Sequence, residues 1–160
     1  MKTLIKALAI SATATLVILS ARAASPNPFI GTWSLDLKKS TFQPTPWPIK
    51  SQTLAITAAS AGKTSIVLDT AGNDGSTFHV QYTTSNDGKP VPVTGDPDDD
   101  SVKVTSINGT TSRTVWMKDG KVTGDGTLTV SADGKTLTGP FSGTNPDGTT
   151  SKARLVYVKQ

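Results

Sequence analysis

The sequence contains no cysteine and no glutamate, and His79 is its one histidine. The absence of cysteine excludes a disulfide framework, thiol chemistry and the cysteine-linked lipid anchor of bacterial lipoproteins. All 12 acidic side chains are aspartates, and many of them stand in turn sequences such as Asp-Gly, where they serve the backbone. The sequence therefore has few residues that could form a hydrolase site with paired carboxylates, a histidine-based triad or a multi-histidine metal centre.

A recognisable catalytic set is missing as well. The sequence has no Gly-x-Ser-x-Gly elbow, no phosphate-binding loop and no histidine pair at metal-ligand spacing. Strand alternation places His79 on a polar face between Thr77 and Gln81, and a lone exposed histidine serves poorly as a catalytic base. We therefore predict that the protein is not an enzyme and that it binds no cofactor.

The segment GDPDDD is the densest acidic stretch of the sequence. Its aspartates are close enough together to gather oxygen ligands around a calcium ion, but the segment lacks the EF-hand loop pattern and no bidentate acid follows it. We favour a solvated acidic loop over a metal site. The alternative calcium ligands are Asp96, Asp98, Asp99 and Asp100.

An apolar run occurs near the start of the chain, at residues 7–19, and two lysines but no acid precede it. The run is short and rich in alanine and threonine for a membrane-spanning helix. Ala21 and Ala23 follow it at the spacing that signal peptidase accepts. We predict a signal peptide at 1–23 that is removed and a single domain at 24–160, located in the periplasm or outside the cell, without a membrane anchor.

The net charge is small once this leader is removed. Lys2, Lys6 and Arg22 leave with it, so the 16 basic residues fall to 13 against 12 acidic ones. The remaining bases are scattered singly, whereas nucleic acids and anionic membranes attract clusters of lysine and arginine. Neither is an expected partner.

Period-2 alternation dominates the rest of the chain, and no segment has helical periodicity of useful length. Turn sequences separate the alternating segments about every ten residues, as Asp-Gly does at 74–75, 119–120 and 133–134. This pattern predicts an all-β fold, an up-and-down antiparallel meander of about eight to nine strands. A closed barrel is the preferred arrangement, because closure removes exposed strand edges. A two-sheet sandwich is the alternative.

Alternation also assigns an inner face, which Trp33, Leu35 and Leu37 share in the first strand. Gly124 and Gly126 fall on the inner face of a later strand, where missing side chains either leave room for a ligand or let the strand coil. A barrel of about eight strands is either filled by side chains or holds one small ligand. The candidate residues of a ligand cavity and its lid are Trp47, Phe78, Tyr82, Val122, Gly124, Gly126, Leu128, Leu137 and Phe141.

A Gly-x-Trp sequence, with Gly31 and Trp33, opens the first predicted strand, and Arg154 lies in the last one. With the leader and the hairpins, these residues resemble the lipocalin pattern of the calycin superfamily. The stretches FIGTWSLDLKKSTF and DGKPVPVTGDP are similar to small, secreted, lipocalin-like bacterial proteins that are mostly uncharacterised. The resemblance implies that the tryptophan closes one end of the barrel with the arginine packed across its ring, and it implies a small apolar or amphipathic ligand.

The segment 41–50 has three prolines, Pro44, Pro46 and Pro48, around Trp47. They enforce extended backbone and forbid a tight hairpin. Trp47 could cover a ligand, anchor a protein partner or pack on its own barrel. We predict a secreted or periplasmic, non-catalytic protein that binds a small apolar or amphipathic ligand. The alternative is a protein-interaction or inhibitor module with a filled barrel core, which contacts its partner through loop 41–50.

Overall fold

The computed structural model describes residues 26–46, 48–144 and 148–160, so the predicted signal peptide lies outside the described residues. Within them the chain forms 11 β-strands and one short 3-10 helix, η1 (Ser60–Gly62). The strands are β1 (Gly31–Leu35), β2 (Thr41–Gln43), β3 (Ile49–Ala58), β4 (Thr64–Gly72), β5 (Thr77–Thr84), β6 (Asp87–Pro92), β7 (Ser101–Asn108), β8 (Thr111–Lys118), β9 (Lys121–Val130), β10 (Thr136–Thr144) and β11 (Thr150–Lys159). No helix in this part of the chain has the length and apolarity needed to cross a membrane.

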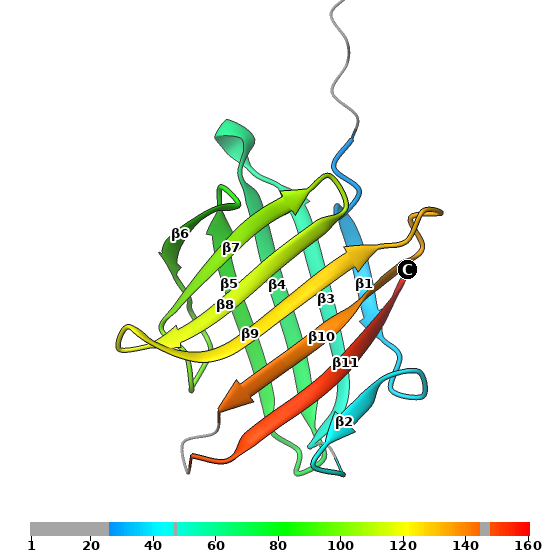
Figure 1. The fold of residues 1–160 in the computed structure, drawn as a ribbon, viewed down its shortest axis with the longest axis vertical. Coiled ribbons are helices and arrows are strands. Elements are labelled where there is room, and N and C mark those ends of the chain that lie inside the picture. The colour runs from blue at the N-terminus through cyan, green and yellow to red at the C-terminus, as the bar shows by residue number, and fades with distance from the viewer. Residues whose placement is uncertain (1–25, 47, 145–147) are drawn as a thin grey trace, which may run out of the picture.

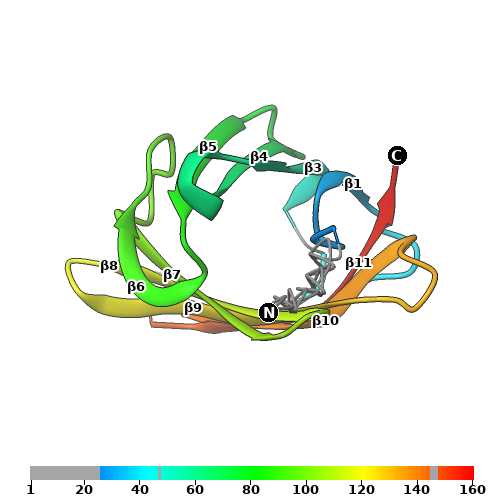
Figure 2. The ribbon, with the colours of Figure 1, turned by 90° about the horizontal axis from the view of Figure 1, so that it is seen from above.

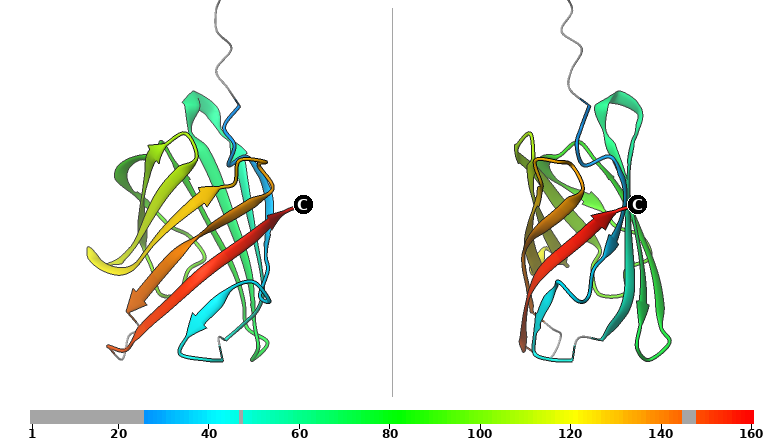
Figure 3. Two further views of the ribbon diagram at one scale, coloured as in Figure 1. Left: turned by 45° about the vertical axis from the view of Figure 1, so that its right-hand side comes forward. Right: turned by 90° about the vertical axis from the view of Figure 1, so that its right-hand side faces the viewer.

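The strands join one antiparallel sheet that curls into a nearly closed barrel (Figures 1 and 2). Neighbouring strands follow the order β5-β4-β3-β1-β11-β10-β9-β8-β7-β6, and β2 pairs with β11 beside this path. From the side, β3, β4 and β5 form one wall of the barrel, and β9, β10 and β11 belong to the facing wall (Figure 3). The prediction of an all-β, up-and-down barrel is therefore confirmed.

The barrel closes between β5 and the segment that follows β6. Gln81 and Thr94 form an isolated bridge there, in which the N–H of Gln81 donates to the carbonyl of Thr94 at 2.9 Å and the reverse bond measures 3.1 Å. Among the described strands, β6 pairs with β7 alone. Its Pro90 and Pro92 have no backbone N–H to offer another strand. β6 is therefore an edge strand, and the Gln81–Thr94 pair completes the ring.

The strand count is larger than the predicted eight to nine, because two proline-containing segments form strands. These are β2, at the start of the 41–50 segment, and β6. Period-2 alternation does not predict strands in such segments, because proline weakens a strand prediction. β2 pairs with residues 152–154 of β11, while β1 pairs with residues 157–159. The two short strands thus share one edge of β11.

Between β1 and β2 the chain turns outward at residues 36–40. The carboxylate of Asp36 accepts two backbone N–H groups of this turn, at 3.1 and 3.2 Å, and so favours the end of the strand. The buried hydroxyl of Ser40 then accepts the N–H of Val156 at 3.0 Å. The expectation that Leu37 faces inward is wrong, since this residue lies in the turn and is 37% exposed.

Trp33 lies at the centre of the core, and its side chain is fully buried. Its indole N–H donates to the carbonyl oxygen of Phe29 at 2.9 Å. Because β1 pairs with both β3 and β11, Trp33 stands where the first and last strands meet. The buried residues packed around it are Leu54, Ile56, Ile66, Val130, Leu137 and Tyr157.

The cation over Trp33 is Lys159 and not Arg154, which corrects the sequence-based expectation. The Lys159 Nζ atom lies 4.9 Å from the centroid of the ring, because the register of β1 and β11 sets these two residues opposite each other. Arg154 is opposite Thr41 and is exposed. Gly31 leaves room for the lysine, since a Cβ atom at this position would lie 2.6 Å from Lys159 Cε, and its φ of +144° favours glycine.

Candidate functional site

A cavity of about 690 Å³ occupies the barrel interior. Small-molecule sites in proteins commonly measure roughly 300–1,000 Å³, so this volume suits one small ligand. The β6–β7 loop, the β8–β9 turn and the adjacent ends of β10 and β11 line one end of the cavity, which is its mouth. Its apolar wall consists of Ile49, Leu54, Ile66, Leu68, Tyr82, Trp116, Leu128, Phe141, Leu155 and Tyr157.

A second cavity of about 360 Å³ lies at the other end of the barrel. The segment Pro26–Phe29 lines it, and the hydrogen bond from Trp33 to Phe29 holds this segment in place. The two cavities adjoin in the middle of the barrel. The residues that line both are Leu54, Ile66, Tyr82, Thr114 and Leu128.

Six of the residues predicted for the cavity line it: Tyr82, Val122, Gly124, Gly126, Leu128 and Phe141. Val122 lies at the rim and is 60% exposed. Leu137 faces Tyr157 across the β10–β11 pair and is buried in the core around Trp33 instead. Phe78 lines neither cavity, because alternation gives the face of a strand but not the height along the barrel. Trp47 lies outside the described residues, so its role as a lid stays a prediction.

The two inner-face glycines of β9 make room for an aromatic ring. A Cβ atom at Gly124 or Gly126 would lie 3.0 Å from a ring carbon of Phe141. Phe141 is opposite Gly126 in the β9–β10 pair, so the ring covers the strand where side chains are missing. The glycines and the ring together form one part of the cavity wall.

Tyr82 and Trp116 bring polar groups to this wall. Their rings pack edge to face, with centroids 5.6 Å apart and an angle of 89° between the ring planes. Within the described residues, neither the Tyr82 hydroxyl nor the Trp116 indole N–H has a hydrogen-bond partner, and both groups remain accessible. Burial raises the pKa of the Tyr82 hydroxyl well above its usual value, so this group stays protonated. Both are free donors that a ligand can use.

Tyr157, in contrast, has its hydroxyl fully engaged by the protein. It donates to the side-chain carbonyl of Gln52, and the amide of Gln52 donates to the Thr70 hydroxyl at 2.9 Å. Burial, and to a smaller extent the nearby Tyr82, raises the pKa of Tyr157. This chain of hydrogen bonds ties β11 to β3 and β4, and its members Gln52 and Tyr157 line the cavity.

Substituting each tyrosine by phenylalanine tests this difference in hydrogen bonding. Tyr157→Phe should lower the free energy of unfolding by about 1–3 kcal/mol, because it removes the donor of a buried amide oxygen. Tyr82→Phe removes a hydroxyl without a protein partner and should change stability by less than about 0.5 kcal/mol. Urea unfolding followed by circular dichroism measures both values, and equal losses in the two variants would contradict the assignment.

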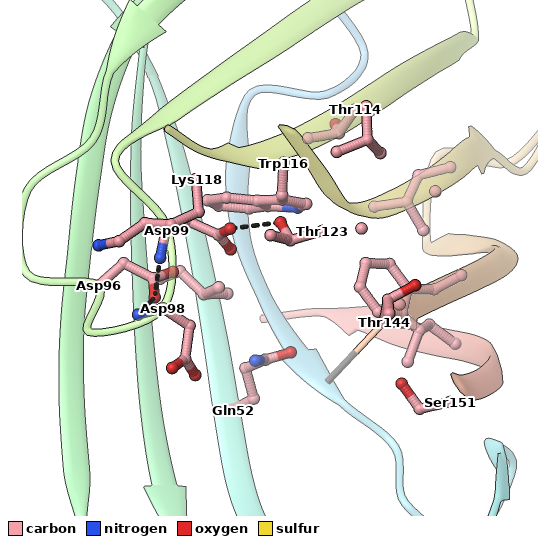
Figure 4. Close-up of a pocket in the computed structure, with 18 of the residues that line it drawn as sticks. Gln52, Asp96, Asp98, Asp99, Thr114, Trp116, Lys118, Thr123, Thr144 and Ser151 are labelled. Carbon is pink, nitrogen blue, oxygen red and sulfur yellow. Dashed lines mark hydrogen bonds between the residues drawn. The ribbon is translucent and has the colours of Figure 1, made fainter. Parts of the chain in front are cut away.

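Charged side chains gather at the mouth of the cavity (Figure 4). The half-buried carboxylate of Asp99 accepts a hydrogen bond from the hydroxyl of Thr123. Burial raises the pKa of Asp99 above its usual value, against the opposing effects of Thr123 and of Lys118. The mouth is therefore polar, whereas the interior is mainly apolar. The charged residues that line the mouth are Asp96, Asp98, Asp99, Asp119, Lys118 and Lys121.

Carboxylates of the acidic loop accept hydrogen bonds from backbone N–H groups of nearby turns. Within the described residues, no three histidine, cysteine or acidic side chains are grouped so that they could hold a metal ion. The Asp96 carboxylate accepts the backbone N–H of Asp98 at 2.9 Å, and the Asp100 carboxylate accepts that of Asp119 at 2.7 Å. The alternative calcium ligands Asp96, Asp98, Asp99 and Asp100 do not form such a group.

His79 lies on the outer surface of the barrel. Its Nδ1 atom is 2.6 Å from Oδ1 of Asp69, which is its cross-strand neighbour in the β4–β5 pair, and both side chains are more than half exposed. Neither residue lines either cavity. This pair is therefore separate from the candidate site.

Comparisons with known proteins find structures with a similar fold but no protein with a related sequence. No protein-family model matches the chain, and no curated protein matches it either. Among solved structures, the fluorescent protein UnaG aligns with 82% of this chain and 97% of its own, at 14% sequence identity and a TM-score of 0.51. Zebrafish ileal bile acid-binding protein in complex with cholic acid aligns with 83% of this chain and 99% of its own, at 10% identity and a TM-score of 0.45. With the strand topology, the likeness to UnaG identifies the fold as a lipocalin-like barrel of the calycin type.

Proposed function

We propose that this protein is a secreted or periplasmic binding protein, without catalytic activity, that holds one small apolar or amphipathic molecule inside its barrel. The observation that carries this proposal is the cavity of about 690 Å³ with its apolar wall. The free donors of Tyr82 and Trp116 would orient the ligand, while burial of its apolar part would supply most of the affinity. The predicted signal peptide supports the location.

The alternative function, a protein-interaction or inhibitor module, was expected to have a filled barrel core. Side chains do not fill the barrel interior, since the larger cavity reaches Leu54, Ile66 and Tyr82 in the middle of the barrel. Trp47, the proposed contact residue of that module, lies outside the described residues. Ligand binding is therefore the function that the described residues favour.

A cavity-filling substitution tests this proposal. Leu128 lines both cavities, so Leu128→Trp should occupy the space where they adjoin. We expect this variant to bind octanol, a neutral amphipathic probe, at least tenfold more weakly than the unsubstituted protein, as measured by isothermal titration calorimetry. Leu68→Trp fills the larger cavity from the facing wall and is expected to act in the same way.

The matched control is Thr129→Trp, which adds the same side chain to the exposed neighbour of Leu128 on β9. It should leave octanol binding within twofold of the original value. Circular dichroism verifies that each variant is folded. The proposal fails if the unsubstituted protein does not bind octanol, or if folded Leu128→Trp and Leu68→Trp both bind it as well as Thr129→Trp does.

A further inference from the structure

We infer that the larger cavity selects an amphipathic molecule whose polar end is positively charged, such as a protonated amine, and that Asp99 contacts this end. The inference rests on the proposed binding function, because it names the ligand class for the same cavity. Its basis is the distribution of charge and of unused hydrogen-bonding groups along the cavity, from the mouth inward.

Negative charge predominates at the mouth. Four aspartates and two lysines line it, namely Asp96, Asp98, Asp99, Asp119, Lys118 and Lys121. Within the described residues, none of these aspartates forms an ion pair, since the ion pairs found there join other residues. Unpaired carboxylates beside a cavity of low polarity attract cations and repel anions.

Asp99 is the best placed of these charges to meet a ligand. It is half-buried, while Lys118 and Lys121 are exposed and can extend their ammonium groups into water. The hydroxyl of Thr123 binds Oδ1 of Asp99, and no described residue donates a hydrogen bond to Oδ2. Burial raises the pKa of this carboxyl, and the nearby charges of Asp96 and Asp98 act in the same direction. An ammonium group would supply both a countercharge and a donor.

The wall beyond the mouth offers an ammonium group an aromatic face. The indole ring of Trp116 lines the same cavity as Asp99, and aromatic faces attract ammonium groups. The polar groups of the interior, in Gln52 and Tyr82, are neutral. No arginine among the described residues lines the cavity, and Arg113 is bound to Asp125 on another part of the surface. A carboxylate ligand would therefore find no cation inside the barrel.

Three probes with the same eight-carbon chain separate charge from hydrophobicity: octylamine, octanol and octanoate. At pH 7 and low ionic strength, we expect the protein to bind octylammonium at least fivefold more tightly than octanoate, with octanol in between. The preference should shrink in 1 M salt, because screening weakens interactions at a solvated mouth. Isothermal titration calorimetry measures all three affinities.

Asp99→Asn tests the assigned contact, because it removes the charge and keeps the shape of the side chain. It should weaken octylammonium binding at least threefold and leave octanol binding within twofold. Asp133→Asn is the matched control, since Asp133 lies in the β9–β10 turn and lines neither cavity. The inference is overturned if octanoate binds as tightly as octylammonium, or if Asp99→Asn and Asp133→Asn behave alike. Binding of none of the probes would refute the proposed function itself.

Discussion

Replacing Trp33 with alanine should lower the free energy of unfolding by about 3–5 kcal/mol, the range observed when a buried aromatic side chain is removed from a core. Trp33 is fully buried, it touches the core where β1, β3 and β11 meet, and its indole N–H holds the Phe29 carbonyl. Alanine would leave a cavity and would free the segment that covers one end of the barrel. Urea unfolding followed by circular dichroism gives the value.

Trp116→Ala is the control for this experiment. Trp116 is only partly buried and already borders the larger cavity, so its removal enlarges an existing space and should cost much less. Lys159→Met separately removes the cation over the Trp33 ring and should cost about 0.5–1 kcal/mol. If Trp33→Ala unfolds at the same urea concentration as the unsubstituted protein, Trp33 does not hold the barrel together.

Gly139→Ala should be the most disruptive single-methyl change in the chain, with an expected loss of about 3 kcal/mol or more. A Cβ atom at this position would lie 1.6 Å from the carbonyl oxygen of Thr127 and 2.7 Å from its carbonyl carbon. Both are backbone atoms, so no side-chain rotation relieves the collision. β9 must move away from β10, which disturbs the pairing of these strands on both sides of the contact.

Gly109→Ala provides the comparison, because a Cβ atom there meets no other atom within 4 Å. Its stability should change by less than about 0.5 kcal/mol, since the added methyl group is free in the β7–β8 turn. Urea unfolding of both variants, together with their yield in the soluble fraction, measures the contrast. A Gly139→Ala variant as stable as Gly109→Ala would show that β9 and β10 do not approach each other this closely.

Alternation in the sequence predicts the fold class and much of the wall, because the inner residues of a barrel repeat every second position. Tyr82 and Leu128 are at such positions, and both line the cavity. Trp116 also lines the cavity, but alternation does not predict it there, since the register of β8 and β9 shifts between Trp116 and Met117. A register irregularity of this kind cannot be read from period-2 counting alone.

Long-range register accounts for the other differences. The resemblance to lipocalins implies that Arg154 packs across Trp33, whereas the pairing of β1 with β11 places Lys159 over the ring. Folding brings the acidic loop at 96–100 to the turn between β8 and β9, where the Asp100 carboxylate accepts the backbone N–H of Asp119. The cluster of aspartates is visible in the sequence, but their contacts with Asp119 and Thr123 depend on this long-range arrangement.

An NMR titration with octanol tests the central claim, ligand binding inside the barrel, most directly. The indole N–H of Trp116 and the backbone N–H groups of Gly124, Gly126 and Leu128 report on the wall of the larger cavity. We predict that their signals shift together and saturate at one octanol per protein, while those of exposed turns such as Gly109 and Asp133 stay in place. Shifts that do not saturate, or that occur only at exposed residues, would contradict the account.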